Sequence, residues 1–66
     1  MNALLQGGPV DGKKLFDLEP CLDLKIQHGK WPHEKLLIYE NSGGEAVEKP
    51  TENMFMVFYY KGVDDA

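Results

Sequence analysis

Seven residues near the start of the chain match part of a phosphate-binding motif. Residues 7–13, Gly-Gly-Pro-Val-Asp-Gly-Lys, fit the first seven positions of the P-loop pattern, in which backbone amides and a lysine hold phosphate groups. The eighth position should carry a hydroxyl that binds magnesium, but here it is Lys14. The segment that follows has strand spacing and is too short, before Pro20, for the helix that the motif requires. We therefore expect a turn closed by Asp11 and Gly12, with no nucleotide and no other cofactor.

Four side chains in the middle of the chain have the chemistry of metal ligands or of a nucleophile and its base. Cys21, His28, His33 and Glu34 are near one another in sequence, yet they form no paired C-x-x-C or H-x-x-x-H unit. Nothing in their spacing brings Cys21 to a histidine. Because the chain has one cysteine, it cannot form an internal disulfide, which is typical of a reduced, intracellular protein. We expect no metal site and no catalytic residue.

The length of the chain limits what it can build. With 66 residues it is expected to form one domain, residues 1–66, near the lower limit for a core that folds alone. Ordering a chain of this size costs on the order of 100 kcal/mol, at about 1.5 kcal/mol per residue, and the burial of apolar surface barely exceeds that cost. Little stability is left for a deep catalytic cavity, so the size favours a binding or structural role over an enzyme.

The charge balance argues against a nucleic-acid partner. The formal net charge is -4, with 11 acidic residues against 7 basic ones, and every basic residue is a lysine. The chain therefore lacks the arginine fork that binds phosphate or guanine, and its negative charge would repel a phosphate backbone. It also lacks an apolar stretch of transmembrane length and a recognisable export signal, so we expect no membrane association and a cytoplasmic protein.

The residues considered above as phosphate, metal or nucleophile candidates must be positioned by strands. The densest apolar run, Asn53 to Gly62, mixes aromatic and β-branched residues and is short for a helix. Because side chains alternate along a strand, both faces of this run are apolar, and a strand of that kind is covered on both sides. Alternation and turn residues predict the remaining strands at residues 2–6, 13–18, 21–28 and 35–41.

Together these strands predict an all-β fold. We expect a single small domain of about five antiparallel strands, in a curled sheet or small barrel with a meander-like order. The polar stretch at about 41–52, with Gly43-Gly44 and Pro50 as breakers, is predicted to be a flexible loop.

Three aromatic side chains are the candidate contacts for a protein partner. Trp31 is the only tryptophan and lies in a predicted turn, which does not need it for solubility. It either folds back as a lid on the open end of the sheet, which is the alternative we favour, or protrudes as an anchor for a partner. Tyr39 and Tyr59, with a free sheet edge that accepts another strand, complete the predicted protein-binding surface.

The two ends of the chain resemble a loose group of very short proteins from tailed-phage and prophage genomes. The matching residues are the Gly-Gly-Pro-x-Asp-Gly turn at 7–12 with Lys13 after it, and Phe58, Tyr60 and Gly62 near the end. The chain departs from the group in its pair of lysines, where arginine is usual, and in its acidic middle segment. Because the group has no established activity, the resemblance implies a fold and a phage origin, and no catalytic or binding residue.

Two functions follow as expectations. The first is a small non-enzymatic phage- or prophage-encoded protein that binds a host or phage protein in the host cytoplasm and modulates it. The alternative is a virion or assembly component, in which the doubly apolar last strand is buried by neighbouring copies. A homodimer is compatible with both.

Overall fold

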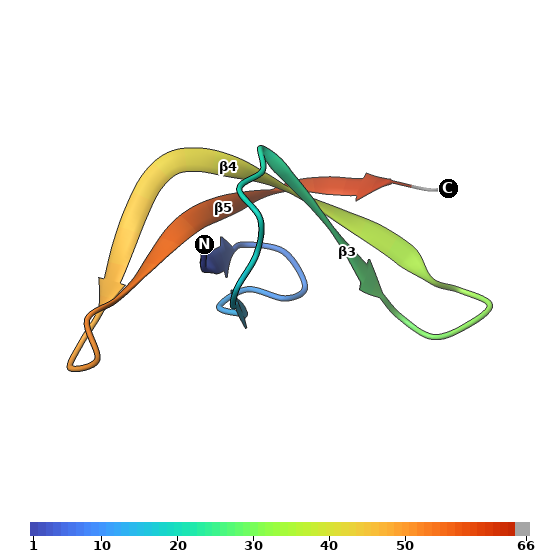
Figure 1. Ribbon diagram of the computed structural model, residues 1–66. Coiled ribbons are helices and arrows are strands. Elements are labelled where there is room, and N and C mark those ends of the chain that lie inside the picture. The colour runs from blue at the N-terminus through green and yellow to red at the C-terminus, as the bar shows by residue number, and fades with distance from the viewer. Residues whose placement is uncertain (65–66) are drawn as a thin grey trace.

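The computed structural model describes residues 1–64 and consists of one five-stranded sheet (Figure 1). The strands are β1 (Ala3–Gln6), β2 (Lys14–Leu15), β3 (Asp23–His28), β4 (Lys35–Glu48) and β5 (Asn53–Asp64). The sheet curls into a half-barrel, so the prediction of a single all-β domain with a curled sheet is confirmed. Over residues 1–64 the structure contains no helix that could cross a membrane.

The strand order, β2-β1-β5-β4-β3, departs from a meander at one place. β1 lies parallel to β5, with Ala3 opposite Met56 and Leu5 opposite Phe58, whereas the other neighbouring pairs are antiparallel. In a meander β5 would be an edge strand with one side unpaired. The parallel pairing with β1 makes β5 the central strand instead, and this pair therefore differs from the antiparallel order that the sequence predicts.

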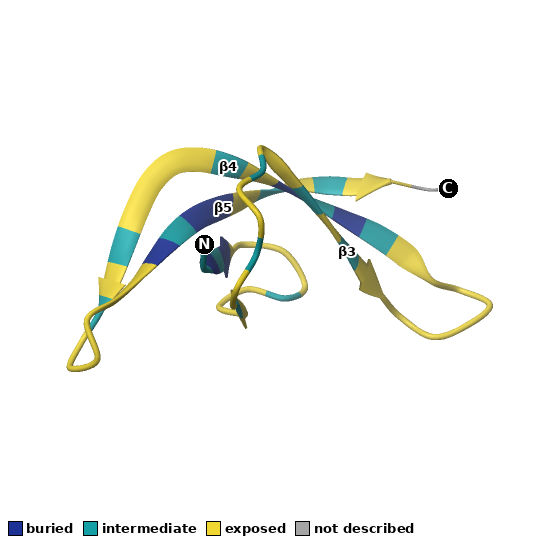
Figure 2. Cartoon of the chain, viewed as in Figure 1, coloured by how far each residue is buried: buried dark blue, intermediate teal, exposed yellow. Residues whose placement is uncertain are grey.

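β5 is buried on both faces only near its centre, whereas its double apolar pattern predicts cover along the whole run; Met54 and Tyr59 are more than half exposed. Phe58 is fully buried on one face and belongs to the same core cluster as Tyr39. Figure 2 shows the buried parts of β4 and β5 in dark blue. Phe55 and Val57 alternate with it, point to the opposite face and are also buried. Phe16 covers Phe55 edge-to-face, with the ring centroids 5.6 Å apart. The main core therefore lies on one face of the sheet and a smaller apolar cluster on the other.

β4 is longer than predicted and includes most of the loop expected at 41–52. It continues to Glu48 in register with β5, so only residues 49–52 form the turn. The register shifts along this stretch, where Ser42 and the two glycines after it face Val57. The Ser42 hydroxyl donates a 2.8 Å hydrogen bond to the Val57 carbonyl, and β4 arches in this region (Figure 1). The glycines that indicated a loop form a β-bulge, which bends a strand without ending it.

The two edge strands are shorter than predicted. β2 comprises Lys14–Leu15 instead of residues 13–18, and β3 begins at Asp23 instead of Cys21. In the connection between them, Leu18 and Cys21 pack against the core cluster. Residues that alternate like a strand in the sequence thus serve as a cover for the sheet.

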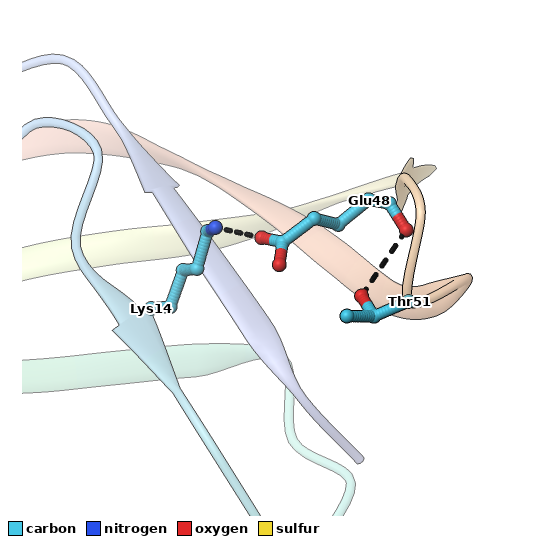
Figure 3. Close-up of polar contacts among 3 residues, drawn as sticks. All are labelled: Lys14, Glu48 and Thr51. Carbon is cyan, nitrogen blue, oxygen red and sulfur yellow. Dashed lines mark hydrogen bonds and ion pairs between the residues drawn. The ribbon is translucent and has the colours of Figure 1, made fainter.

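An ion pair ties β2 to the far end of the β4–β5 hairpin. The Lys14 ammonium contacts a carboxylate oxygen of Glu48 (Figure 3) and lies 5.5 Å from the centroid of the Phe55 ring. Thr51 Oγ1 donates a 3.3 Å hydrogen bond to the Glu48 carbonyl, which helps to close the turn between β4 and β5. The paired oxygen atom itself is buried, but the two side chains remain 40% and 34% exposed, so solvent screens much of the attraction between them.

Candidate protein-binding surface

Trp31 lies in the turn between β3 and β4 and is the most exposed large apolar side chain of residues 1–64, with 83% of its surface accessible. The turn is closed by the His33 amide, which donates a 2.7 Å hydrogen bond to the Lys30 carbonyl. At its base the Gln27 side chain donates a hydrogen bond to the Glu34 carboxylate. The lid position predicted for Trp31 is therefore wrong, because the turn begins beyond the last paired residues of β3 and β4 and holds the indole in solvent.

Tyr39 is a core residue. Its side chain is fully buried, its ring centroid is 5.3 Å from that of Tyr60, and its hydroxyl donates a 2.6 Å hydrogen bond to the Gly7 carbonyl. Burial raises the pKa of the Tyr39 phenol above its ordinary value of 10.0; the Val10 backbone opposes this shift, while Tyr60 and Asp11 add to it. Tyr39 is thus not available for the partner contact that the sequence predicts, because its polar tip fastens the N-terminal turn to the sheet.

Tyr59 lies beside a shallow, open groove of about 720 Å³, and 51% of its surface is exposed. The rest of its lining comes from Leu4, Gln6 and Tyr60 and from four residues of the turn at 7–12. Within this turn the Gly7 amide donates a 2.7 Å hydrogen bond to the Asp11 carboxylate. The Asp11 carboxylate thus accepts the hydrogen bond of an amide that a P-loop would direct at phosphate, as expected for a turn closed by its own aspartate.

The predicted contact residues do not form one continuous surface. The turn that carries Trp31 ends where β4 begins, at Lys35, whereas Tyr59 lies opposite Glu40. Five residues of strand at about 3.3 Å each place these two points roughly 17 Å apart along β4. Since Tyr39 is buried in the core, Trp31 is the only one of the three predicted contact residues exposed at the β3–β4 turn.

The side chains considered for metal or nucleophilic chemistry are dispersed. Among residues 1–64, no three His, Cys, Asp or Glu side chains are grouped so that they could hold a metal ion. Cys21 precedes β3 and is half-buried against the core, while His28 is exposed at the other end of that strand. His33 is exposed in the next turn. β3 therefore separates the thiol from both imidazoles.

Two apolar surface features were missed by reasoning from the sequence. Leu22, next to the edge strand β3, is 78% exposed, although Leu24 and Ile26 on the same predicted face pack toward the core. Val47 and Met54 lie opposite each other near the end of the β4–β5 hairpin, and both are more than half exposed. Alternation assigns Leu22 to the apolar face, and only the place of β3 at the sheet edge shows that no described residue covers it.

Comparison with known proteins gives no family assignment. No family model, no curated protein and no solved structure matches the chain.

Proposed function

We propose that this chain is a small non-enzymatic protein that docks on another protein by placing the Trp31 side chain in a pocket of its partner. The observation that carries the proposal is the 83% exposure of Trp31 on a hydrogen-bonded turn. Tryptophan is enriched among the residues that dominate interface energetics, because one indole removes a large apolar area from water. A turn that already holds the indole outward reduces the conformational entropy lost on binding. Lys30 and His33, both exposed, would lie at the rim of such a contact.

The biological setting we propose is that of a phage- or prophage-encoded protein that modulates a host or phage protein in the host cytoplasm. Its support is the resemblance carried by the turn at 7–12 and by the aromatic residues of β5. The small size of the chain and its acidic, arginine-free composition also fit a protein that acts by contact with another protein.

Trp31→Ala tests the docking role, with Lys49→Ala, which truncates an exposed side chain in the turn beyond the opposite end of β4, as the control. Both side chains are exposed, so each substitution should change the free energy of unfolding by less than about 0.5 kcal/mol. Trp31→Ala should weaken the binding of a partner captured from bacterial lysate by about 30-fold or more, the effect of an interface hot spot. Calorimetric titration with the purified partner measures this loss, and equal loss in both variants would contradict the assignment to Trp31.

A second candidate is a virion or assembly component that is covered by neighbouring copies. The exposed Val47–Met54 pair favours it, because two apolar side chains facing each other on a hairpin form a contact surface of their own. Mass spectrometry of purified phage particles separates the two functions, since a virion component is found in the particles at a fixed copy number and a modulator of host proteins is not.

A further inference from the structure

We infer that the outer side of β3 is a dimerisation edge, on which β3 of a second copy of this chain pairs antiparallel with Leu24 at the two-fold axis. β3 is an edge strand of the sheet and pairs with β4 on one side only. Such an edge presents unpaired N–H and C=O groups, which either remain hydrated or pair with another strand. The sequence of β3 and the direction of its backbone groups favour one partner and one register.

The hydrogen bonds between β3 and β4 determine which backbone N–H and C=O groups of β3 point away from the sheet. The Asn41 amide donates a 2.7 Å hydrogen bond to the Leu22 carbonyl, next to β3. Hydrogen-bonded and non-hydrogen-bonded pairs alternate along an antiparallel ladder, so the even-numbered residues of β3 direct their backbone groups toward β4. The backbone groups of Asp23, Lys25 and Gln27 therefore point outward, where a second strand can pair with them.

Charge selects the register among those that this backbone geometry allows. With Leu24 opposite Leu24 of the second copy, Asp23 of each copy faces Lys25 of the other, and two ion pairs form across the axis. Moving the axis by one residue places either Asp23 or Lys25 opposite itself, which brings like charges together. An axis through Ile26 leaves both charges without an opposite charge.

The same register covers the exposed leucine at the edge. Leu22 of one copy lies opposite Ile26 of the other, on the face that packs toward the core, and the 78% exposed Leu22 side chain gains an apolar neighbour. Leu24 pairs with its counterpart at a non-hydrogen-bonded position, where the two backbones approach most closely. The polar face and the apolar face of β3 are thus self-complementary at one and the same alignment.

The test exchanges the charges at the edge. Lys25→Glu makes it acidic and Asp23→Lys makes it basic, so each variant alone brings like charges together, whereas an equimolar mixture restores two opposite-charge pairs. Sedimentation velocity and light scattering should show wild-type dimers of twice the 7.5 kDa chain mass. Each single variant should dimerise roughly 10- to 100-fold more weakly than wild type, and the mixture should regain dimers. Lys49→Glu, the same charge change in the β4–β5 turn, should leave dimerisation unchanged.

Amide hydrogen exchange locates the interface independently of mass. The outward amides of Asp23 and Lys25 should exchange slowly in wild type at high concentration and quickly in Lys25→Glu, while circular dichroism of the variant remains that of a folded sheet. A wild-type monomer at about 1 mM, or a mixture that fails to regain dimers, overturns the proposal. The proposal does not rest on Trp31, since Trp31→Ala should dimerise like wild type whether or not it loses a partner.

Discussion

Gly8 offers a quantitative test of how the turn at 7–12 packs on the sheet. Its φ is +71°, and a Cβ atom at this position would lie 2.6 Å from Tyr60 Cγ and 2.8 Å from the Tyr39 hydroxyl oxygen. A left-handed backbone costs a residue other than glycine about 1–2 kcal/mol, and forcing a methyl group against packed rings costs about 1–3 kcal/mol. Gly8→Ala should therefore lower the free energy of unfolding by about 2–5 kcal/mol, a large part of the stability of so small a domain.

Gly12→Ala separates the steric contribution from the backbone contribution. Gly12 has a similar φ of +84°, but apart from its own chain neighbours no described atom would lie within 4 Å of a Cβ at this position. This control should lose about 1–2 kcal/mol for the backbone alone. In urea denaturation, with a slope of about 1 kcal/mol per molar for a small domain, the Gly8→Ala midpoint should lie about 1–3 M below that of Gly12→Ala. Equal midpoints would show that the rings of Tyr60 and Tyr39 do not press on Gly8.

The two remaining predictions concern charge. Because burial raises the pKa of Tyr39, the unfolded chain releases this proton first, so the stability contributed by the neutral phenol is complete below about pH 10 and is lost as the pH rises above that value. In urea denaturation measured at a series of pH values, Tyr39→Phe should lose less of its free energy of unfolding above pH 10 than the wild type does. An equal loss in both proteins would show that the Tyr39 phenol is not the group responsible. Lys14→Met should cost only about 0.5–1 kcal/mol, because its pair with Glu48 is screened at side-chain exposures of 40% and 34%. A loss above about 3 kcal/mol in thermal unfolding would mean that the pair behaves as a buried one.

The sequence was informative where a local pattern determines the structure. The double apolar pattern of 53–62 predicted cover on both faces of the last strand, which holds for the centre of β5 and not for Met54 or Tyr59. Asp11 with the glycines at 7–12 predicted the turn. The parallel pairing of β1 with β5 was not predicted, because it joins residues more than fifty positions apart and depends on which strand fills the free side of β5. Gly43-Gly44 was misinterpreted because the same dipeptide suits a loop and a bulge.

The candidate protein-binding surface also depends on contacts between distant parts of the chain, which a local sequence pattern does not determine. Composition singled out Trp31, but whether its indole is a lid or an anchor depends on what lies beneath the turn, which is a tertiary fact. Tyr39 and Tyr59 look alike in the sequence, since both lie in apolar strands. The structure separates them because the Tyr39 hydroxyl finds a carbonyl acceptor at Gly7 inside the fold, while Tyr59 points to the open groove.

The two edges of the half-barrel differ in a way that gives β3 its proposed role. β2 is an edge of two residues, and its Lys14 is held by Glu48, so it offers little backbone to another strand. β3 offers six residues. A lysine near the centre of an edge strand commonly prevents indiscriminate pairing, because an apolar strand cannot neutralise it. Asp23, two positions before Lys25, makes the edge selective. It allows pairing with a strand that places an acidic residue opposite Lys25 and a basic residue opposite Asp23. In the proposed register, β3 of a second copy is such a strand.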